Sequence, residues 1–383
     1  MKGEQAVVIV GAGPAGLAVS ACLTRLSISN LILERETCSV SLWRNRAYDR
    51  LCLHLGKIFC QLPHMPYPEP TPTFPSKAQF ISYVDDYMAR FGLQPSYGRW
   101  VRRAAYDATA GTWRLEVSNN QSGEAEEYTA RFLVVATGEN GEGFVPEIGG
   151  LDGFPGDVLH SSEYKSGGAY WGREVLVVGC GNSGMEIAFD LCEHGARTSV
   201  VVRNPVHVLT KEIVYMGMQL LNCLPVSSVD PLAIALGKNM FGNLEKYGIS
   251  EPQEGPFFLK AATGRSPVLD VGTIDKIKSG EIKVRHSIKH IRGDNVEFED
   301  GKVHQFDAIV FATGYKSTVR TWLQEGDGLF NKDGFPEAGY PDHWKGKNGL
   351  YCAGFSRRGL FGISEDARKI ADDISNHLLN RHK

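Results

Sequence analysis

The sequence has no long apolar run, little net charge and no closely spaced pair of cysteines. No stretch approaches the roughly 18 consecutive apolar residues that a membrane-spanning helix requires. A net charge of −3 over 383 residues gives no general attraction to nucleic acid or to an anionic membrane. The chain passes from Met1 almost directly into an apolar strand pattern, which leaves no room for a cleavable signal. We therefore expect a cytoplasmic protein with no membrane span and no nucleic-acid partner, and the sequence leaves its oligomeric state open.

The eight cysteines are scattered through apolar surroundings, and none belongs to a C-x-x-C pair. They are Cys22, Cys38, Cys52, Cys60, Cys180, Cys192, Cys223 and Cys352. This pattern favours buried, reduced thiols over metal ligands or a redox-active pair. We expect no metal site, and the absence of neighbouring cysteines argues against a disulfide reductase.

What the sequence does contain is the same glycine-rich motif twice, each time directly after a buried-strand pattern. The first copy, after residues 6–10, consists of Gly11, Ala12, Gly13, Pro14, Ala15 and Gly16. The second copy, after residues 175–178, consists of Gly179, Cys180, Gly181, Asn182, Ser183 and Gly184. In such a motif the first glycine permits a tight turn, the second lets the backbone approach a pyrophosphate, and the third allows close helix–strand packing. The helix that follows holds the phosphates at its N-terminus. The sequence therefore predicts an α/β protein with two dinucleotide-binding, Rossmann-like domains.

The residue after the second strand of each domain indicates which nucleotide the domain prefers. Strand 31–33 ends at Glu34, followed by Arg35, and a carboxylate there can accept hydrogen bonds from both ribose hydroxyls. This copy suits FAD or NAD. Strand 199–202 ends at Arg203, whose guanidinium suits the 2′-phosphate of NADPH. The alternative for Arg203 is a solvated cation at a strand end.

Each half closes with a buried strand that ends in Ala-Thr-Gly, at residues 132–138 and 309–314. We place Thr137, Gly138, Thr313 and Gly314 beside the nucleotides. An antiparallel meander is expected before each closing strand. The predicted organisation is a discontinuous FAD-binding domain, residues 1–165 and 306–383, interrupted by an NADPH-binding domain. That inserted domain spans residues 166–305 and contains an apolar segment near residues 210–260.

The linker between the halves resembles the identifying motif of flavin-containing monooxygenases. It reads F-x-G-x-x-x-H-x-x-x-Y from Phe154 to Tyr164. We assign Tyr164 to cofactor binding and His160 to a hydrogen-bonded hinge rather than to proton transfer. The whole chain is similar to the plant YUCCA family of this class, in particular at residues 48–55, 74–77, 136–140, 177–186, 267–273, 311–317 and 349–355.

This resemblance implies an FAD- and NADPH-dependent enzyme of auxin biosynthesis. Its implied reaction is the oxidative decarboxylation of indole-3-pyruvate, or of phenylpyruvate, to the corresponding acid by O2 through a flavin C4a-hydroperoxide. His54 and Asn140 are predicted near the flavin or its peroxide, and Trp43 near the adenine side of FAD. Two alternatives remain: a non-catalytic redox sensor that binds both nucleotides, and an uncoupled NADPH oxidase that releases hydrogen peroxide.

Three further expectations concern the substrate and two helices. Lys211, Lys260 and Arg265 are all candidates to bind the substrate carboxylate, and the sequence does not choose among them. Residues 76–79 form a capping box that begins a helix. The last helix is expected to begin near residue 364, with Ser364 as its N-cap.

Overall fold

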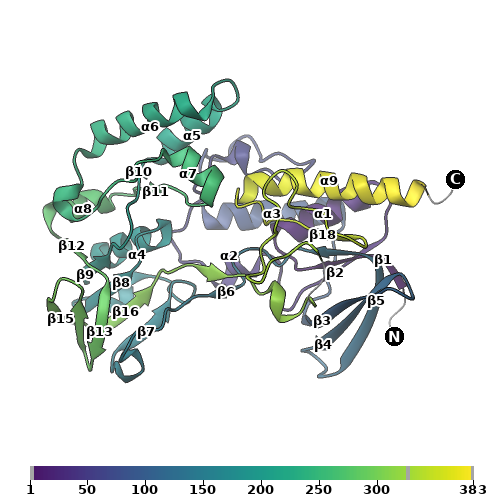
Figure 1. Cartoon of the computed structure of the whole chain (residues 1–383), viewed down its shortest axis with the longest axis horizontal. Coiled ribbons are helices and arrows are strands. Elements are labelled where there is room, and N and C mark those ends of the chain that lie inside the picture. Colours follow the sequence, from purple (N-terminus) through teal and green to yellow (C-terminus); the bar gives the residue numbers. More distant parts are fainter. Residues whose placement is uncertain (1–3, 325–327, 381–383) are drawn as a thin grey trace. The chain divides into compact units, whose positions relative to one another are not determined.

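The protein, a computed structural model described here for residues 4–324 and 328–380, divides into two compact units (Figure 1). The first unit comprises the chain up to Asn45, residues Lys57–Glu142 and the chain from Tyr315 onward. The second comprises Arg46–Gly56 and Gly143–Gly314, so most of it interrupts the first unit in sequence. The short strands β6 (Glu142–Gly143) and β17 (Tyr315–Lys316) lie where the chain passes between the units. The predicted domain limits at 165/166 and 305/306 both fall within the second unit, and the assignment of one nucleotide to each domain remains a prediction.

The first unit is built on a six-stranded sheet with the order β2-β1-β5-β4-β3, in which β18 also pairs with β5. Its strands are β1 (Glu4–Val10), β2 (Asn30–Leu33), β3 (Arg99–Asp107), β4 (Thr112–Asn119), β5 (Ala125–Val135) and β18 (Leu350–Cys352). β2, β1, β5 and β18 are parallel, whereas β3, β4 and β5 form the expected antiparallel meander. Residues 6–10 of β1 are all apolar, and residues 7–10 are buried. A continuous apolar run of this kind is usual for a parallel strand that is covered on both faces.

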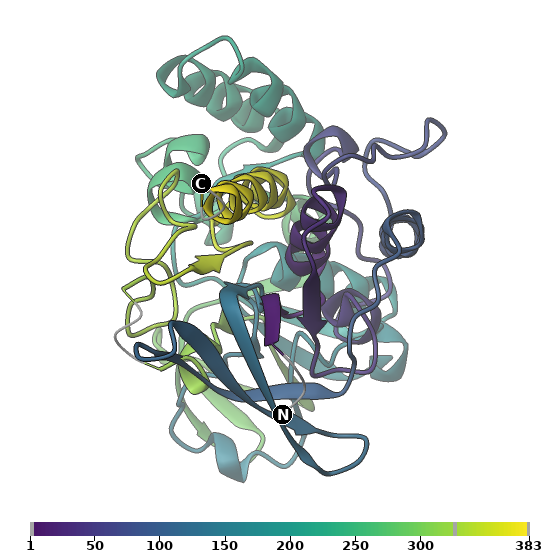
Figure 2. The same cartoon turned by 90° about the vertical axis from the view of Figure 1, so that its right-hand side faces the viewer.

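The described part of this unit contains four α-helices: α1 (Pro14–Arg25), α2 (Ser41–Asn45), α3 (Lys77–Phe91) and α9 (Leu360–Leu379). The predicted capping box is confirmed, because Ser76 and Gln79 exchange side-chain and backbone hydrogen bonds at the start of α3. α9, drawn in yellow and seen nearly end-on in Figure 2, packs against α1. The prediction for its start was wrong: α9 begins at Leu360, after Gly359 with φ 60°. Ser364 lies inside this helix, where its hydroxyl donates to the carbonyl of Gln61 instead of capping the first turn.

The second unit contains a parallel five-stranded sheet with the order β12-β9-β8-β16-β7. Its strands are β7 (Asp157–His160), β8 (Glu174–Val178), β9 (Arg197–Val201), β12 (Ile282–Arg285) and β16 (Ala308–Phe311). The antiparallel meander is present as β13 (Ile288–Arg292), β14 (Asn295–Phe298) and β15 (Val303–Gln305). A separate parallel pair joins β10 (Val208–Leu209) to β11 (Val268–Leu269). The helices are α4 (Asn182–Glu193), α5 (Lys211–Leu220), α6 (Val226–Phe241), α7 (Pro256–Thr263) and α8 (Thr273–Ser279).

The central strands of the two sheets correspond one to one. The order β2-β1-β5 in the first unit matches β9-β8-β16 in the second, and a helix follows β1 and β8 directly. This confirms the predicted fold class of two Rossmann-like domains, one inserted into the other. None of the helices in the described ranges is long and apolar enough to cross a membrane. No group of three or more His, Cys, Asp or Glu side chains suited to a metal ion occurs among the described residues.

Candidate functional site

The first glycine motif forms a turn that leaves no room for side chains at its two ends. A Cβ added to Gly11, whose φ is 110°, would lie 2.6 Å from the carbonyl oxygen of Ala136. A Cβ added to Gly16 would lie 2.0 Å from the carbonyl oxygen of Gly11, so α1 packs directly on the turn. A Cβ on Gly13 would meet no atom of the described chain within 4 Å. The middle of the turn is therefore open to a ligand, while its ends are closed by the protein backbone.

The second motif repeats this geometry almost atom for atom. A Cβ on Gly179, with φ 112°, would lie 2.5 Å from the carbonyl oxygen of Ala312, and one on Gly184 would lie 1.9 Å from that of Gly179. A Cβ on Gly181 again meets nothing within 4 Å in the described structure. As far as the structure is described, α1 and α4 also begin without a side-chain cap. Their first N–H groups and the positive ends of their dipoles remain available to a phosphate.

The predicted ribose-binding carboxylate, Glu34, is buried and held in place at the end of β2. Its Oε2 accepts from the N–H of Ala12 at 2.6 Å and its Oε1 from the N–H of Glu36 at 2.9 Å. Burial raises the pKa of this carboxyl, and the two backbone hydrogen bonds act in the opposite direction. Each oxygen keeps a further lone pair with which it can accept from a ribose hydroxyl.

The side chain of Thr137 is a second observation that favours a ligand at the first motif. Its Oγ1 is buried and has no hydrogen-bond partner within residues 4–324 and 328–380. A buried hydroxyl without a partner is costly, and a bound polar group would remove that cost. Thr137 also lies beside the turn, since its Cα would be 3.3 Å from a Cβ on Gly11. Both observations fit the FAD that the sequence predicts here.

The remaining predicted residues of the first unit are spread around this turn. Arg35 Nη2 donates to the carbonyl of Gly141 at 3.5 Å, and the ring of Trp43 packs on that of Phe80 with centroids 4.3 Å apart. Gly138 has a positive φ of 75°, and Asn140 is exposed. The roles of these residues remain predictions.

In the second unit, a cavity of about 490 Å³ opens beside the second glycine motif. Gly179, Gly181, Arg203 and Thr313 all line it, so four residues predicted to bind NADPH are brought together. Cys180 lines it as well, and burial raises the pKa of its thiol.

Arg265 also lines this cavity, although from the sequence it is only one of three candidates to bind the substrate carboxylate. The parallel pairing of β10 with β11 brings the segment around Arg265 close to the chain that follows Arg203. Arg265 Nη2 donates to the carbonyl of Pro205 at 2.9 Å, which fixes its position. Two guanidinium groups therefore line one cavity, and both are suited to bind a phosphate ester.

His54, which with Asn140 is predicted near the flavin or its peroxide, contacts a buried carboxylate on α4. Its Nε2 lies 3.0 Å from Oε1 of Glu186, and the Glu186 side chain is 2% exposed. Burial alone would raise the pKa of Glu186, but the hydrogen bond and charge of His54 and the charge of Lys211 hold it below its ordinary value. An ionised carboxylate only accepts, so His54 Nε2 is the donor. Its Nδ1 has no partner among the residues that the structure describes.

The two other carboxylate candidates have different surroundings. Lys211 lies near Glu186, on whose pKa its charge acts. Lys260 Nζ donates to the carbonyl of Gly264 and thereby closes the C-terminus of α7. Neither lysine lines the cavity that contains Arg203 and Arg265.

The linker motif of the second unit is held by internal hydrogen bonds. Tyr164 is buried, and its hydroxyl donates to Asp190 Oδ2 at 2.6 Å. His160 Nε2 lies 3.0 Å from the carbonyl oxygen of Gly314, and burial lowers the pKa of its imidazole. Neutral His160 can donate this hydrogen bond, which holds the linker against the end of the closing strand.

Asn182, a residue of the second glycine motif, has its side chain engaged by the protein itself. Its Oδ1 accepts from the N–H of Leu269 at 2.7 Å, so this side chain holds β11 in place.

Comparisons with known proteins agree with this geometry. The protein-family profile described as pyridine nucleotide-disulphide oxidoreductase matches residues 8–215. The chain is 54% identical to the probable indole-3-pyruvate monooxygenase YUCCA10 of Arabidopsis thaliana, covering 98% of each protein. It is 49% identical to the indole-3-pyruvate monooxygenase YUCCA1 of rice, Oryza sativa subsp. japonica, covering 96% of this chain and 90% of that protein. Its fold matches a flavin-containing monooxygenase from Stenotrophomonas maltophilia with a TM-score of 0.73 at 20% identity, over 98% of this chain and 99% of the other.

Proposed function

Because this chain belongs to the YUCCA family of flavin-dependent monooxygenases, with FAD and NADPH as cofactors, we propose that it oxidatively decarboxylates indole-3-pyruvate to indole-3-acetic acid. Phenylpyruvate is the second acid we propose as a substrate. We also propose that the enzyme works in the cytoplasm.

The observation that supports this proposal best is the pair of matching glycine turns with opposite charges beside them. Glu34 stands at the first turn, where a carboxylate suits a ribose and repels a 2′-phosphate. Arg203 and Arg265 stand at the second, where they suit that phosphate. We therefore assign FAD to the first unit and NADPH to the second.

The proposed reaction consumes the keto acid, O2, NADPH and a proton, and yields the shorter acid, CO2, NADP⁺ and water. Bound flavin supplies the transfer of reducing equivalents from NADPH to O2. The protein holds both nucleotides by their phosphates and places His54 through its hydrogen bond to Glu186. One oxygen atom of O2 enters the product carboxylate and the other leaves as water.

A disulfide reductase, which the family profile's description includes, is not supported by the cysteines. All eight are free thiols, and burial raises the pKa of Cys22 and of Cys60 to about 12. A thiol with such a pKa is almost entirely protonated at neutral pH and is a poor nucleophile.

Isotopically heavy O2 provides a direct test of the proposed reaction. The FAD-loaded enzyme, supplied with NADPH and indole-3-pyruvate, is expected to incorporate one heavy oxygen atom into each molecule of indole-3-acetic acid. Mass spectrometry of the product measures this. Acid that carries only solvent oxygen would contradict the proposed reaction. Because released hydrogen peroxide would carry the same heavy oxygen, the measurement is repeated with catalase, and loss of the heavy acid under that condition would mean that free peroxide decarboxylates the keto acid outside the enzyme.

Removing the carboxylate that holds His54 is expected to uncouple the enzyme. Glu186→Ala takes away a charged hydrogen bond worth about 1.5–3 kcal/mol, so His54 loses its fixed orientation. We expect the acid formed per NADPH to fall about tenfold or more, while NADPH oxidation continues. Product and hydrogen peroxide are both measured against NADPH consumed.

Two further variants distinguish positioning from a general loss of structure. Glu186→Gln keeps an acceptor for His54 and is expected to restore most of the coupling. Glu193→Gln alters an exposed residue of the same helix, paired with Lys276 at 3.0 Å, and should leave the coupling unchanged. Equal uncoupling in all three variants would contradict a role for the His54–Glu186 contact.

A further inference from the structure

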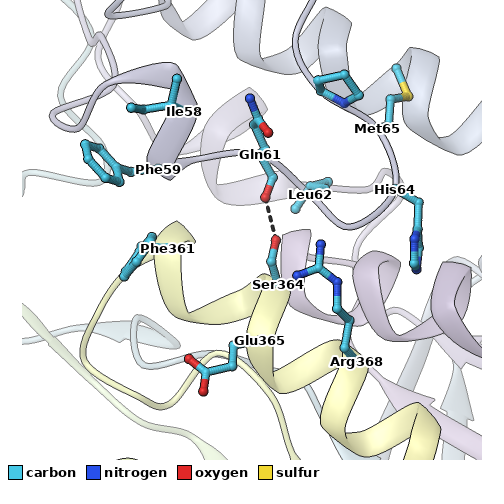
Figure 3. Close-up of a pocket in the computed structure, with 11 residues that line it drawn as sticks. Ile58, Phe59, Gln61, Leu62, His64, Met65, Phe361, Ser364, Glu365 and Arg368 are labelled. Carbon is cyan, nitrogen blue, oxygen red and sulfur yellow. Dashed lines mark hydrogen bonds between the residues drawn. The ribbon is translucent and has the colours of Figure 1, made fainter. Parts of the chain in front are cut away.

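The first unit contains a second cavity, of about 510 Å³, which none of the predicted site residues lines. We call it the α9 cavity. Residues 58–66 form one wall, and Phe361, Ser364, Glu365 and Arg368 of α9 form the other (Figure 3). These helix residues are spaced three and four apart, so they share one face of α9. The hydrogen bond from Ser364 to the carbonyl of Gln61 ties the two walls together. The volume is within the range of pockets that bind small molecules.

One end of the α9 cavity is apolar and open to solvent. Ile58 is 46% exposed and Phe361 is 36% exposed, which is high for side chains of this kind. The ring of Phe59 meets that of Phe361 nearly edge-on, at 81° and 5.7 Å between centroids. A flat aromatic ligand placed against these side chains would remove apolar surface from water and find rings to pack on.

The other end of the α9 cavity carries two charged side chains, which differ in their partners within the described residues. Glu365 is already paired with Arg358 at 3.3 Å and with Lys369 at 2.8 Å, and it accepts from the hydroxyl of Tyr340 at 2.9 Å. Arg368, by contrast, has no hydrogen bond or ion pair among the described residues. Figure 3 shows its guanidinium reaching from α9 toward the wall that contains Gln61 and Leu62.

His64 lies in the same wall and supports an anion rather than a cation. Burial and the charges of Arg25 and Arg368 lower the pKa of its imidazole, and Asp372 opposes this shift only in part. The charges that act on His64 are therefore mainly positive. Its Nε2 lies 3.6 Å from Cys22 Sγ, so Nδ1 is the ring nitrogen left to donate a hydrogen bond to an anion.

We propose that the α9 cavity binds an aromatic monocarboxylate, with its rings against Ile58 and Phe361 and its carboxylate on Arg368. The choice of an indole acid rests on the proposed function, whose substrate and product both belong to this class. The apolar end selects the ring system, and the single guanidinium selects one negative charge. An aromatic amide of the same shape would lack the charged contact.

Binding of indole-3-acetate to the FAD-loaded protein, measured by isothermal titration calorimetry, tests this proposal. The wild-type protein is expected to bind one molecule, and Arg368→Gln to weaken binding about tenfold to a hundredfold. Phe361→Ala should also weaken it. Lys345→Gln, which removes a cation paired with Asp373 of the same helix at 2.7 Å, is the matched control and should bind normally. Indole-3-acetamide should bind weakly and equally to wild type and Arg368→Gln.

The outcome that overturns the proposal is indole-3-acetate binding that is absent from the wild type or equal in wild type and Arg368→Gln. Because no turnover is needed, this result is independent of whether the keto acid is oxidised.

Steady-state kinetics then show whether the α9 cavity binds the substrate or the product. A higher KM for indole-3-pyruvate with an unchanged kcat in Arg368→Gln supports a substrate site. Unchanged kinetics with lost acetate binding support a separate site for the product.

Discussion

Replacing Arg203 and Arg265 together by glutamine is expected to weaken NADPH binding by on the order of a hundredfold to ten-thousandfold. Each arginine lines the cavity beside the second glycine turn. A charged hydrogen bond to a phosphate contributes about 1.5–3 kcal/mol, and two such contacts serve the same group. NADH has no 2′-phosphate, so its binding should change little, and the preference for NADPH should largely disappear.

Anaerobic reduction of the flavin, followed over a range of NADPH and NADH concentrations, measures this effect. The two single variants are compared with the double variant, because neighbouring contacts to one phosphate are not expected to be additive. Lys260→Gln serves as the control, since that lysine closes the C-terminus of α7 and lies outside the cavity lining. Loss of FAD would show that the two nucleotides are assigned to the wrong units. An equal loss of NADH and NADPH binding would show that the two arginines do not bind the 2′-phosphate.

Adding one methyl group to different glycines of the same turn is expected to have two distinct effects. In Gly184→Ala the new Cβ would lie 1.9 Å from the carbonyl oxygen of Gly179, so α4 must move away from the turn. We expect a loss of about 3 kcal/mol in the free energy of unfolding, because the clash involves backbone that cannot rotate aside. In Gly181→Ala the Cβ meets no described atom within 4 Å, so the fold and bound FAD should be retained.

Gly181→Ala should nevertheless lose NADPH-dependent flavin reduction almost completely. The space that its Cβ enters is the one through which the pyrophosphate approaches the backbone. Thermal unfolding, FAD absorbance and anaerobic reduction together separate the two effects. Gly153→Ala, at a glycine with similar open space and no positive φ, should change none of these quantities. Normal reduction by NADPH in Gly181→Ala would contradict the assignment of the second turn to that nucleotide.

The sequence predicted those parts of the site that depend on neighbouring residues. Each glycine turn is specified within six positions, and Glu34 and Arg203 follow from the strand beside it. The capping box at Ser76 is similarly local, because its two partners are three residues apart.

Contacts between distant segments could not be predicted in the same way. Arg265 reaches the cavity beside the second glycine turn because β10 pairs with β11. These two strands have two residues each and are too short to show a periodic pattern. Glu186 looked like an ordinary helical residue, and its contact with His54 joins positions 132 apart. Ser364 was predicted as an N-cap because serine is common at that position. The sequence does not show that the carbonyl of Gln61, 303 positions away, accepts a hydrogen bond from its hydroxyl.

We conclude that this chain couples NADPH oxidation to decarboxylation of an indole keto acid. The measurement that tests it most directly is the amount of indole-3-acetic acid and of hydrogen peroxide formed per NADPH consumed by the purified, FAD-loaded protein in air. We predict close to one acid per NADPH with little peroxide when indole-3-pyruvate is present. NADPH consumption that yields only peroxide, or no consumption at all, would contradict the account.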